Sequence, residues 1–131
     1  AEKDPRIVKK YARLGRYIGM IFQLTDDCMD FEASEEAAQK TVRSDYEQNV
    51  ITLPLIYAFR RLEDFKNKAR DHILPRSEID NAVRQTGGLD YTRKVAEEYY
   101  GKSRALIRDL QLPEEKENRL KLILDKSFRL V

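Results

Sequence analysis

A long stripe of apolar side chains near the start of the sequence limits the possible folds more strongly than any other feature. Its members are Ile7, Tyr11, Leu14, Ile18, Ile21, Thr25 and Cys28. Spacings of three and four residues place them on one face of a helix from about Asp4 to Phe31. Asp4 followed by Pro5 is a typical helix start, with an N-cap and then proline at the first helical position. The sequence therefore predicts a long amphipathic helix.

The remainder of the chain continues the helical pattern in shorter segments. Only 5 Gly and 4 Pro occur among 131 residues, too few for an all-β protein with many tight turns. Thr52 marks the start of one segment as a cap, and the pair Gly87-Gly88 ends another that begins at the cap Ser77. We predict an all-α fold, a single domain over residues 1–131, with four helices after the first. Their expected ranges are 52–70, 77–87, 90–110 and 113 onward.

Two features interrupt this pattern. Residues 33–49 are polar and lose the helical period, which predicts a long connection of the kind that often forms a lid or binding loop. Gly15 and Gly19 lie inside the first helix, where each costs about 1 kcal/mol relative to alanine. We expect them to let another helix or a ligand approach closely.

Composition excludes several classes of protein. Lys and Arg total 25 against 23 for Asp and Glu, so the net charge of +2 argues against a nucleic-acid binder, which normally carries a basic stripe. The longest nearly apolar run, residues 50–59, is too short to span a bilayer. The single cysteine, Cys28, excludes an internal disulfide framework and a Cys-based zinc site. Since no signal peptide pattern is visible, a cytoplasmic location is expected.

Four polar side chains share one face of the long helix: Gln23, Asp26, Asp27 and Asp30. Like charges at these spacings weaken an isolated helix by about 0.2–0.5 kcal/mol per pair. Aspartate is also a poor helix former, and negative charge is unwelcome near the C-terminal end that we expect for this helix. Three unfavourable terms together suggest a compensating cation.

The chemistry of the candidate ligands narrows the choice of cation. All are hard oxygens, which favours Mg²⁺, Mn²⁺ or Ca²⁺ over Zn²⁺. The linear calcium-loop pattern is absent from the sequence. Magnesium usually takes one or two carboxylates and completes its shell with water and phosphate oxygens, which predicts a phosphate-ester or diphosphate ligand. An acidic, solvated helix end is the alternative, and the spacing alone leaves both interpretations open.

The same residues resemble a known family. Phe-Gln-x-x-Asp-Asp-x-x-Asp-Phe at 22–31 resembles the second aspartate-rich motif of the trans-type polyprenyl diphosphate synthases, which include farnesyl, geranylgeranyl and heptaprenyl-type enzymes. Lys40, Ser44-Asp45 and Thr-Leu-Pro-Leu at 52–55 are similar to the stretch that follows this motif in the family. Gly87-Gly88 and Leu112-Pro113 also fit. The resemblance covers essentially the whole chain, in order.

The sequence departs from the family pattern in two ways. Gln39 and Asn49 stand where glycine is usual, which changes the backbone freedom of the loop. The family's other aspartate-rich motif, and its basic residues for isopentenyl diphosphate, are not found in these 131 residues. The resemblance is therefore to the C-terminal portion of such a synthase, a fragment of a helical bundle of the isoprenoid-synthase type.

The resemblance implies a magnesium-dependent prenyltransferase of isoprenoid biosynthesis. Such an enzyme condenses an allylic diphosphate with isopentenyl diphosphate to make a polyprenyl diphosphate. By the same resemblance Asp26, Asp27 and Asp30 would be catalytic metal ligands, with Asp26 the strongest and the other two able to act through water. Lys40 would contact the leaving diphosphate, and Gln23 the allylic substrate.

Each of these roles has a simpler alternative. Without the motif, Lys40 would be a solvated surface lysine and Gln23 would make a structural hydrogen bond. Phe22 is expected to bind substrate by lining the prenyl pocket, or to pack in the core together with Leu24. Cys28 is expected to be a small buried hydrophobic residue.

The resemblance also implies partners. The native enzyme is expected to be a homodimer, or a heterodimer with another synthase subunit. Because half of the metal ligands would come from elsewhere, we expect the 131 residues alone to be inactive. The alternative function is a non-catalytic helical subunit that regulates or assembles with such a synthase, since a half-bundle must present apolar surface to a partner.

Overall fold

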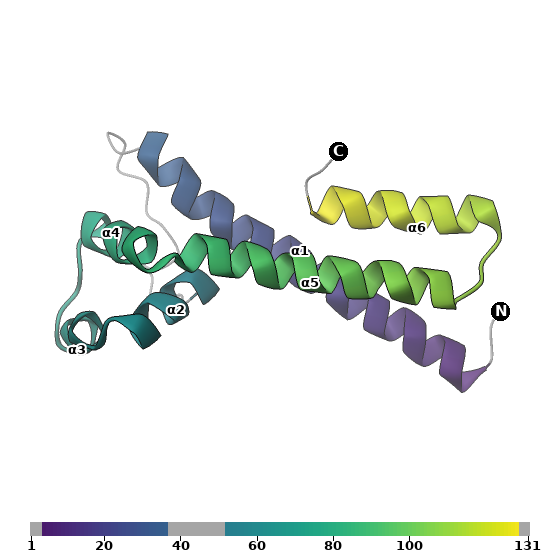
Figure 1. Ribbon diagram of the computed structural model, residues 1–131, viewed down its shortest axis with the longest axis horizontal. Helices are drawn as coiled ribbons and strands as arrows, with labels where there is room; N and C mark the ends of the chain where they lie inside the picture. Colours follow the sequence, from purple (N-terminus) through teal and green to yellow (C-terminus); the bar gives the residue numbers. More distant parts are fainter. Residues whose placement is uncertain (1–3, 37–51, 129–131) are drawn as a thin grey trace. The chain divides into compact units, whose positions relative to one another are not determined.

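The computed structural model describes residues 4–36 and 52–128, and the side chains of all of these except 32–36. The described residues form six helices and no strand, which confirms the predicted all-α class. Figure 1 shows their order along the chain. The helices are α1 (Pro5–Glu36), α2 (Leu53–Arg61), α3 (Glu63–Asp71), α4 (Arg76–Thr86), α5 (Gly88–Asp109) and α6 (Glu114–Ser127).

The prediction of one helix over 52–70 was wrong, because the chain breaks at Leu62. This residue is extended, with φ −123° and ψ 93°, although its N–H still bonds the carbonyl of Ala58 at 2.9 Å. The next helix, α3, has two acidic residues in its first turn and two basic residues in its last turn. This is the charge pattern that the dipole of a separate helix favours. The break lets the rings of Phe59 and Phe65 stack with their centroids 5.3 Å apart.

The predicted end of the first helix was also too early. The helix α1 continues past Phe31 to Glu36, so residues 33–36 are helical and not part of a loop. Helix formation costs little there because Glu and Ala, which dominate the segment, are good helix formers. The rest of the expected loop, 37–49, lies outside the described residues.

Most helix-boundary signals are confirmed. The Asp4 carboxylate accepts the Arg6 N–H at 2.9 Å, as an N-cap should, and Gly87 ends α4 in the left-handed conformation with φ 78°. Two details differ. Thr52 occupies the cap position of α2, but its buried hydroxyl makes no capping bond and has no hydrogen-bond partner. The helix α4 begins at Arg76, after Pro75, and not after a Ser77 cap.

The chain groups into two compact units. The first contains residues 1–25 and 94–131, that is, the start of α1, most of α5 and all of α6. Its core is closed by aliphatic side chains from all three helices, and the rings of Tyr17 and Tyr99 contact each other at a tilt of 50°, with their centroids 5.5 Å apart. The buried members of this core are Leu14, Ile21, Leu106, Ile107, Leu110 and Leu124.

The second unit, Asp26–Arg93, contains the aspartates. In it α2 packs against both α3 and α4, and Phe31 anchors the end of α1 in the same core. Tyr57 stacks on Tyr91 at 4.4 Å, with the Arg61 guanidinium 4.9 Å from the Tyr57 ring. The buried core residues are Phe31, Leu55, Ala58, Phe65, Leu74, Ile79, Ala82 and Val83.

Close approach occurs at a different glycine from those expected. A Cβ atom built on Gly15 or Gly19 meets nothing within 4 Å, so neither packs closely against the described residues. A Cβ on Gly88 would lie 2.6 Å from the Pro54 carbonyl oxygen. Because only glycine fits this contact, the start of α5 lies directly on the start of α2, and two of the motif segments identified in the sequence touch.

Candidate metal and diphosphate site

The three aspartates of α1 differ in their exposure to solvent. The Asp26 side chain is exposed, that of Asp27 is buried at 8% exposure, and that of Asp30 is about one third exposed. All three belong to the second unit and lie within two turns of one helix. Asp26 is therefore the carboxylate of the motif that solvent and solutes reach most easily.

Asp30 is held by an arginine from α4. The Nη2 atom of Arg76 donates a hydrogen bond to the Asp30 carbonyl oxygen at 3.0 Å and lies 3.9 Å from the Asp30 carboxylate. The Nε atom of Arg76 is 3.7 Å from Asp80, one turn further along α4. This arrangement ties the aspartate motif to a segment 46 residues later in the sequence.

The longer α1 changes the predicted electrostatics. The helix dipole acts mainly within the last turn, and Asp30 lies six residues before Glu36. The dipole therefore disfavours the negative charge of the aspartates less than it would if the helix ended at Phe31. Their mutual repulsion remains, and Arg76 offsets part of it at Asp30.

The residues fit a magnesium ion as a partial ligand set. In the described ranges, no three His, Cys, Asp or Glu side chains are grouped so that they could hold a metal by themselves. Magnesium commonly takes only one or two protein carboxylates and obtains its other oxygens from water and phosphate. The exposed carboxylate of Asp26 and the carboxylate of Asp30, about one third exposed, offer hard oxygen donors of this kind.

The other predicted site residues have different placements. Phe22 and Gln23 are exposed and belong to the first unit. At 50% exposure Phe22 does not pack in the core, whereas Leu24, at 5%, does, so only the Leu24 half of that alternative is confirmed. Lys40 lies outside the described residues.

Cys28 is buried among the aspartates, as expected for a small hydrophobic residue. Its side chain is 4% exposed, and its Sγ lies 3.9 Å from the Leu89 carbonyl oxygen. Burial raises the pKa of the Cys28 thiol to about 11; Arg93 opposes this shift, while Asp27 and Asp90 add to it. The thiol is therefore protonated near neutral pH and supplies no thiolate ligand.

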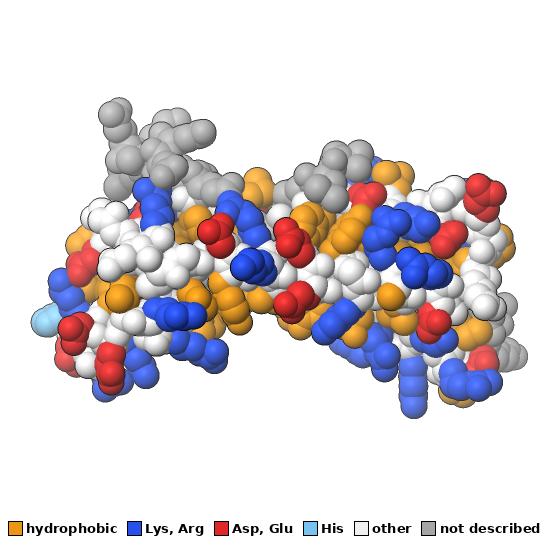
Figure 2. Space-filling view, in the orientation of Figure 1, with side chains coloured by type: hydrophobic (Ala, Val, Ile, Leu, Met, Phe, Trp, Pro, Cys, Tyr) orange, Lys and Arg blue, Asp and Glu red, His pale blue; other side chains and the backbone are white. Residues whose placement is uncertain are grey.

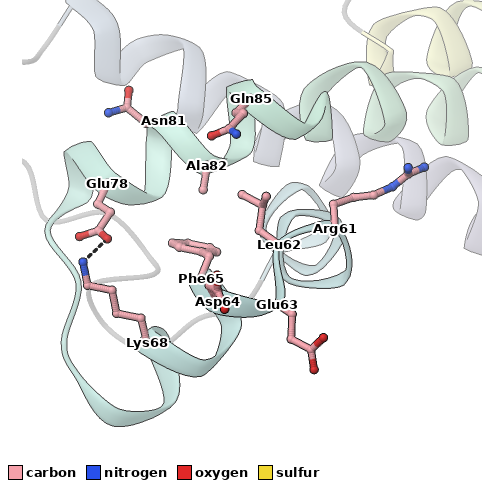
Figure 3. Close-up of a pocket in the computed structure, with 10 residues that line it drawn as sticks. All are labelled: Arg61, Leu62, Glu63, Asp64, Phe65, Lys68, Glu78, Asn81, Ala82 and Gln85. Atoms are coloured by element: carbon pink, nitrogen blue, oxygen red, sulfur yellow. Dashed lines mark hydrogen bonds and ion pairs between the residues drawn. The ribbon is translucent and has the colours of Figure 1, made fainter.

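The second unit also contains an open groove of about 590 Å³ (Figure 3). Leu62, Phe65 and Ala82 form its apolar part, and an ion pair of 2.6 Å between Lys68 and Glu78 lies at its edge. None of the predicted site residues lines it. Its charged rim carries both signs, so it offers no concentrated charge for a diphosphate.

The charges of the surface are mixed. On the face drawn in Figure 2, both basic and acidic side chains are present, with hydrophobic side chains among them. In the part of the chain that the structure describes, no helix combines the length and apolar character needed to cross a membrane.

Comparison with known proteins shows the family to which this sequence belongs. Residues 1–86 match the model of the polyprenyl synthetase family. Component 2 of the heptaprenyl diphosphate synthase of Geobacillus stearothermophilus is 31% identical over 115 residues, which are 82% of this chain and 35% of that protein. The octaprenyl diphosphate synthase of Escherichia coli is 34% identical over 106 residues, 73% of this chain and 32% of its own length.

A third relative gives a similar result. The decaprenyl-diphosphate synthase of Dictyostelium discoideum is 29% identical over 124 residues, 92% of this chain and 27% of its own length. The chain thus spans about a third of the length of these curated relatives. The family match covers the aspartates of α1 and all of α2, α3 and α4. This chain belongs to the polyprenyl synthetase family.

Proposed function

We propose that these residues form one wall of the catalytic site of a magnesium-dependent prenyltransferase. The reaction condenses an allylic diphosphate with isopentenyl diphosphate to give a polyprenyl diphosphate. The observation that carries the proposal is the exposed Asp26, presented by a family-matched helix whose neighbouring carboxylate is already anchored by Arg76.

The residues of the chain have distinct tasks in this proposal. Asp26 binds the metal directly, and Asp30 supports it through water because Arg76 already engages its carboxylate. Asp27 is buried, and its charge helps to keep the Cys28 thiol neutral. Bound magnesium would neutralise the negative charge that grows on the leaving diphosphate. Lys40 would add a positive charge to the same diphosphate.

The allylic chain needs an apolar, water-excluding surface, because a carbocation would otherwise be trapped by water. Phe22 is half exposed and Gln23 precedes Asp26 by three residues on α1. We propose that Phe22 lines the path of the prenyl chain and that Gln23 contacts the allylic end of the substrate.

A complementary portion completes the site. The relatives from Geobacillus stearothermophilus and Bacillus subtilis are named as component 2 of a heptaprenyl diphosphate synthase, so those proteins work with another component. We propose that the present residues likewise act in a dimer, of two like or two unlike subunits. The remaining metal ligands come from outside these 131 residues.

The same names favour a second candidate function, a non-catalytic helical subunit that assembles with a synthase. Exposed apolar side chains on α1 fit either function, since both require a partner surface. They include Val8, Met20, Phe22 and Met29. The two candidates differ in whether Asp26 binds a metal–diphosphate complex.

Calorimetric titration distinguishes them. The probe is geranyl thiolodiphosphate, an allylic diphosphate analogue with sulfur as the bridging atom, added to the 131-residue chain with and without Mg²⁺. The enzyme proposal predicts binding only with Mg²⁺, weakened at least about tenfold by Asp26→Ala because a metal ligand is lost. The matched control is Asp71→Ala, which removes an exposed carboxylate of the same unit at the end of α3 and should bind like the unmodified chain.

Equal binding by the Asp26→Ala and Asp71→Ala variants would contradict a metal role for Asp26. Absence of Mg²⁺-dependent binding, in this chain and in its assembly with a partner component, would favour the non-catalytic subunit.

A further inference from the structure

Arg76 occupies a position that helix electrostatics disfavour. It is the first residue of α4, directly after Pro75, where the helix dipole favours acids over bases. Its side chain is also only 19% exposed. A charged side chain with so little solvent requires compensating partners, because desolvating an ion is costly. Its position therefore calls for an explanation beyond the packing of α4.

The partners of Arg76 supply that explanation. Its Nη2 hydrogen bond to the Asp30 carbonyl, at 3.0 Å, fixes the α1 backbone, and the same atom lies 3.9 Å from the Asp30 carboxylate. Asp80, whose side chain is 13% exposed, lies 3.7 Å from Nε. The guanidinium thus has one carboxylate of α1 and one of α4 within ion-pair distance. Its planar fork suits such a double contact, which an ammonium group could not reproduce.

We propose that Arg76 is a positioning residue of the metal site: it fixes Asp30 and the turn of α1 that presents Asp26. This inference rests on the proposed function, since it assigns Arg76 a role toward the metal. Arg76 itself does not touch the ion. Asp30 and Asp80 together carry two negative charges, and Arg76 carries one positive charge. The group therefore keeps a net negative charge, which favours binding of a cation beside it.

Two simpler roles for Arg76 predict other effects of its removal on cation affinity. If it only balanced charge, its removal would make the region more negative and would strengthen cation binding. If it only held the second unit together, its removal would lower thermal stability and leave cation affinity unchanged. A positioning role predicts weaker cation binding despite the lost positive charge, because the carboxylates are no longer held in place.

The test measures Mn²⁺ affinity of the 131-residue chain by electron paramagnetic resonance, with inorganic pyrophosphate present. Arg76→Met should weaken Mn²⁺ binding about tenfold, the usual effect of removing a group that orients metal ligands. Arg70→Met, an exposed position on α3 in the same unit, removes an equal charge and should leave affinity unchanged or slightly tighter. Arg76→Lys keeps the charge without the fork and should weaken binding about threefold or more.

Unchanged or tighter Mn²⁺ binding by Arg76→Met would overturn the inference. If that variant loses its helical circular dichroism, Arg76→Lys decides: affinity equal to that of the unmodified chain overturns the positioning role. If neither the unmodified chain nor its assembly with a partner component binds Mn²⁺ with pyrophosphate, the proposed function fails and the inference fails with it. If the unmodified chain binds and the variants match it, only the role of Arg76 fails.

Discussion

At the scale of single residues, the three aspartates of α1 differ in their exposure to solvent although they lie within two turns of one helix. The spacing of Asp26, Asp27 and Asp30 predicted one acidic face. It could not separate an exposed Asp26 from a buried Asp27, because burial depends on distant segments. Arg76 was not expected at all, since its contact with Asp30 spans 46 residues. The one available signal was a basic residue at a helix start, against the dipole.

The buried Cys28 thiol makes stability depend on pH. Its pKa lies near 9.0 when solvated and at about 11 in the folded chain, so the folded state retains a proton that the unfolded state loses. Its contribution to stability is complete below pH 9 and is lost as the pH rises toward 11. This loss lowers the free energy of unfolding by at most about 2 to 3 kcal/mol.

Urea unfolding from pH 8 to 11 measures this effect. The free energy of unfolding should fall more steeply in the unmodified chain than in Cys28→Ala, which removes the titrating group while other residues titrate alike. Parallel pH profiles for the two proteins would show that the thiol ionises normally in the fold.

At the scale of elements, periodicity predicted the helices and local chemistry set many of their ends. The apolar stripe placed α1, and Gly87 ended α4 as expected. The break at Leu62 escaped detection because no Gly or Pro marks it. The stacking of Phe59 on Phe65 accompanies the break.

The glycines give a prediction with an internal control. Gly15→Ala should raise the free energy of unfolding by about 1 kcal/mol, because a methyl group there meets only open space and alanine favours helix. Gly88→Ala should lower it by about 1–3 kcal/mol, because the new Cβ would press on the Pro54 carbonyl. Urea denaturation compares the two variants. Equal effects would refute the close contact of α2 and α5.

Two leucines of α6 give a second prediction with a matched control. Leu124 is fully buried in the core of the first unit, whereas Leu122 on the same helix is 46% exposed. Leu124→Ala should destabilise by about 2–5 kcal/mol through a cavity and lost burial. Leu122→Ala should change stability by less than about 1 kcal/mol, because nearly half of the side chain is already exposed to water. A larger effect at Leu122, measured by thermal unfolding, would mean that the exposed face of α6 is covered in solution.

At the scale of the whole molecule, the polyprenyl synthetase family could be identified from the motifs, but the division into two compact units could not. Helical periodicity carries no information about which parts of α1 and α5 cluster together. The chain spans about a third of the length of these curated relatives.

The 131 residues alone should form no polyprenyl diphosphate from isopentenyl and allylic diphosphates with Mg²⁺. The reason is that, in the proposed function, the remaining metal ligands come from outside these 131 residues. A radiolabelled product assay checks this, with Escherichia coli octaprenyl diphosphate synthase as the positive control. Turnover by the chain alone, abolished by Asp26→Ala, would show that these residues suffice.

The most direct test of the account asks where a metal–diphosphate complex binds on this chain. In an amide-resolved magnetic resonance experiment, substoichiometric Mn²⁺ with inorganic pyrophosphate broadens the signals of nearby residues. We predict selective broadening around Asp26 on α1, and none at Glu114, Glu115 and Glu117, which form an equally acidic first turn of α6. Equal broadening at both places, or broadening at α6 alone, would contradict a specific site on α1.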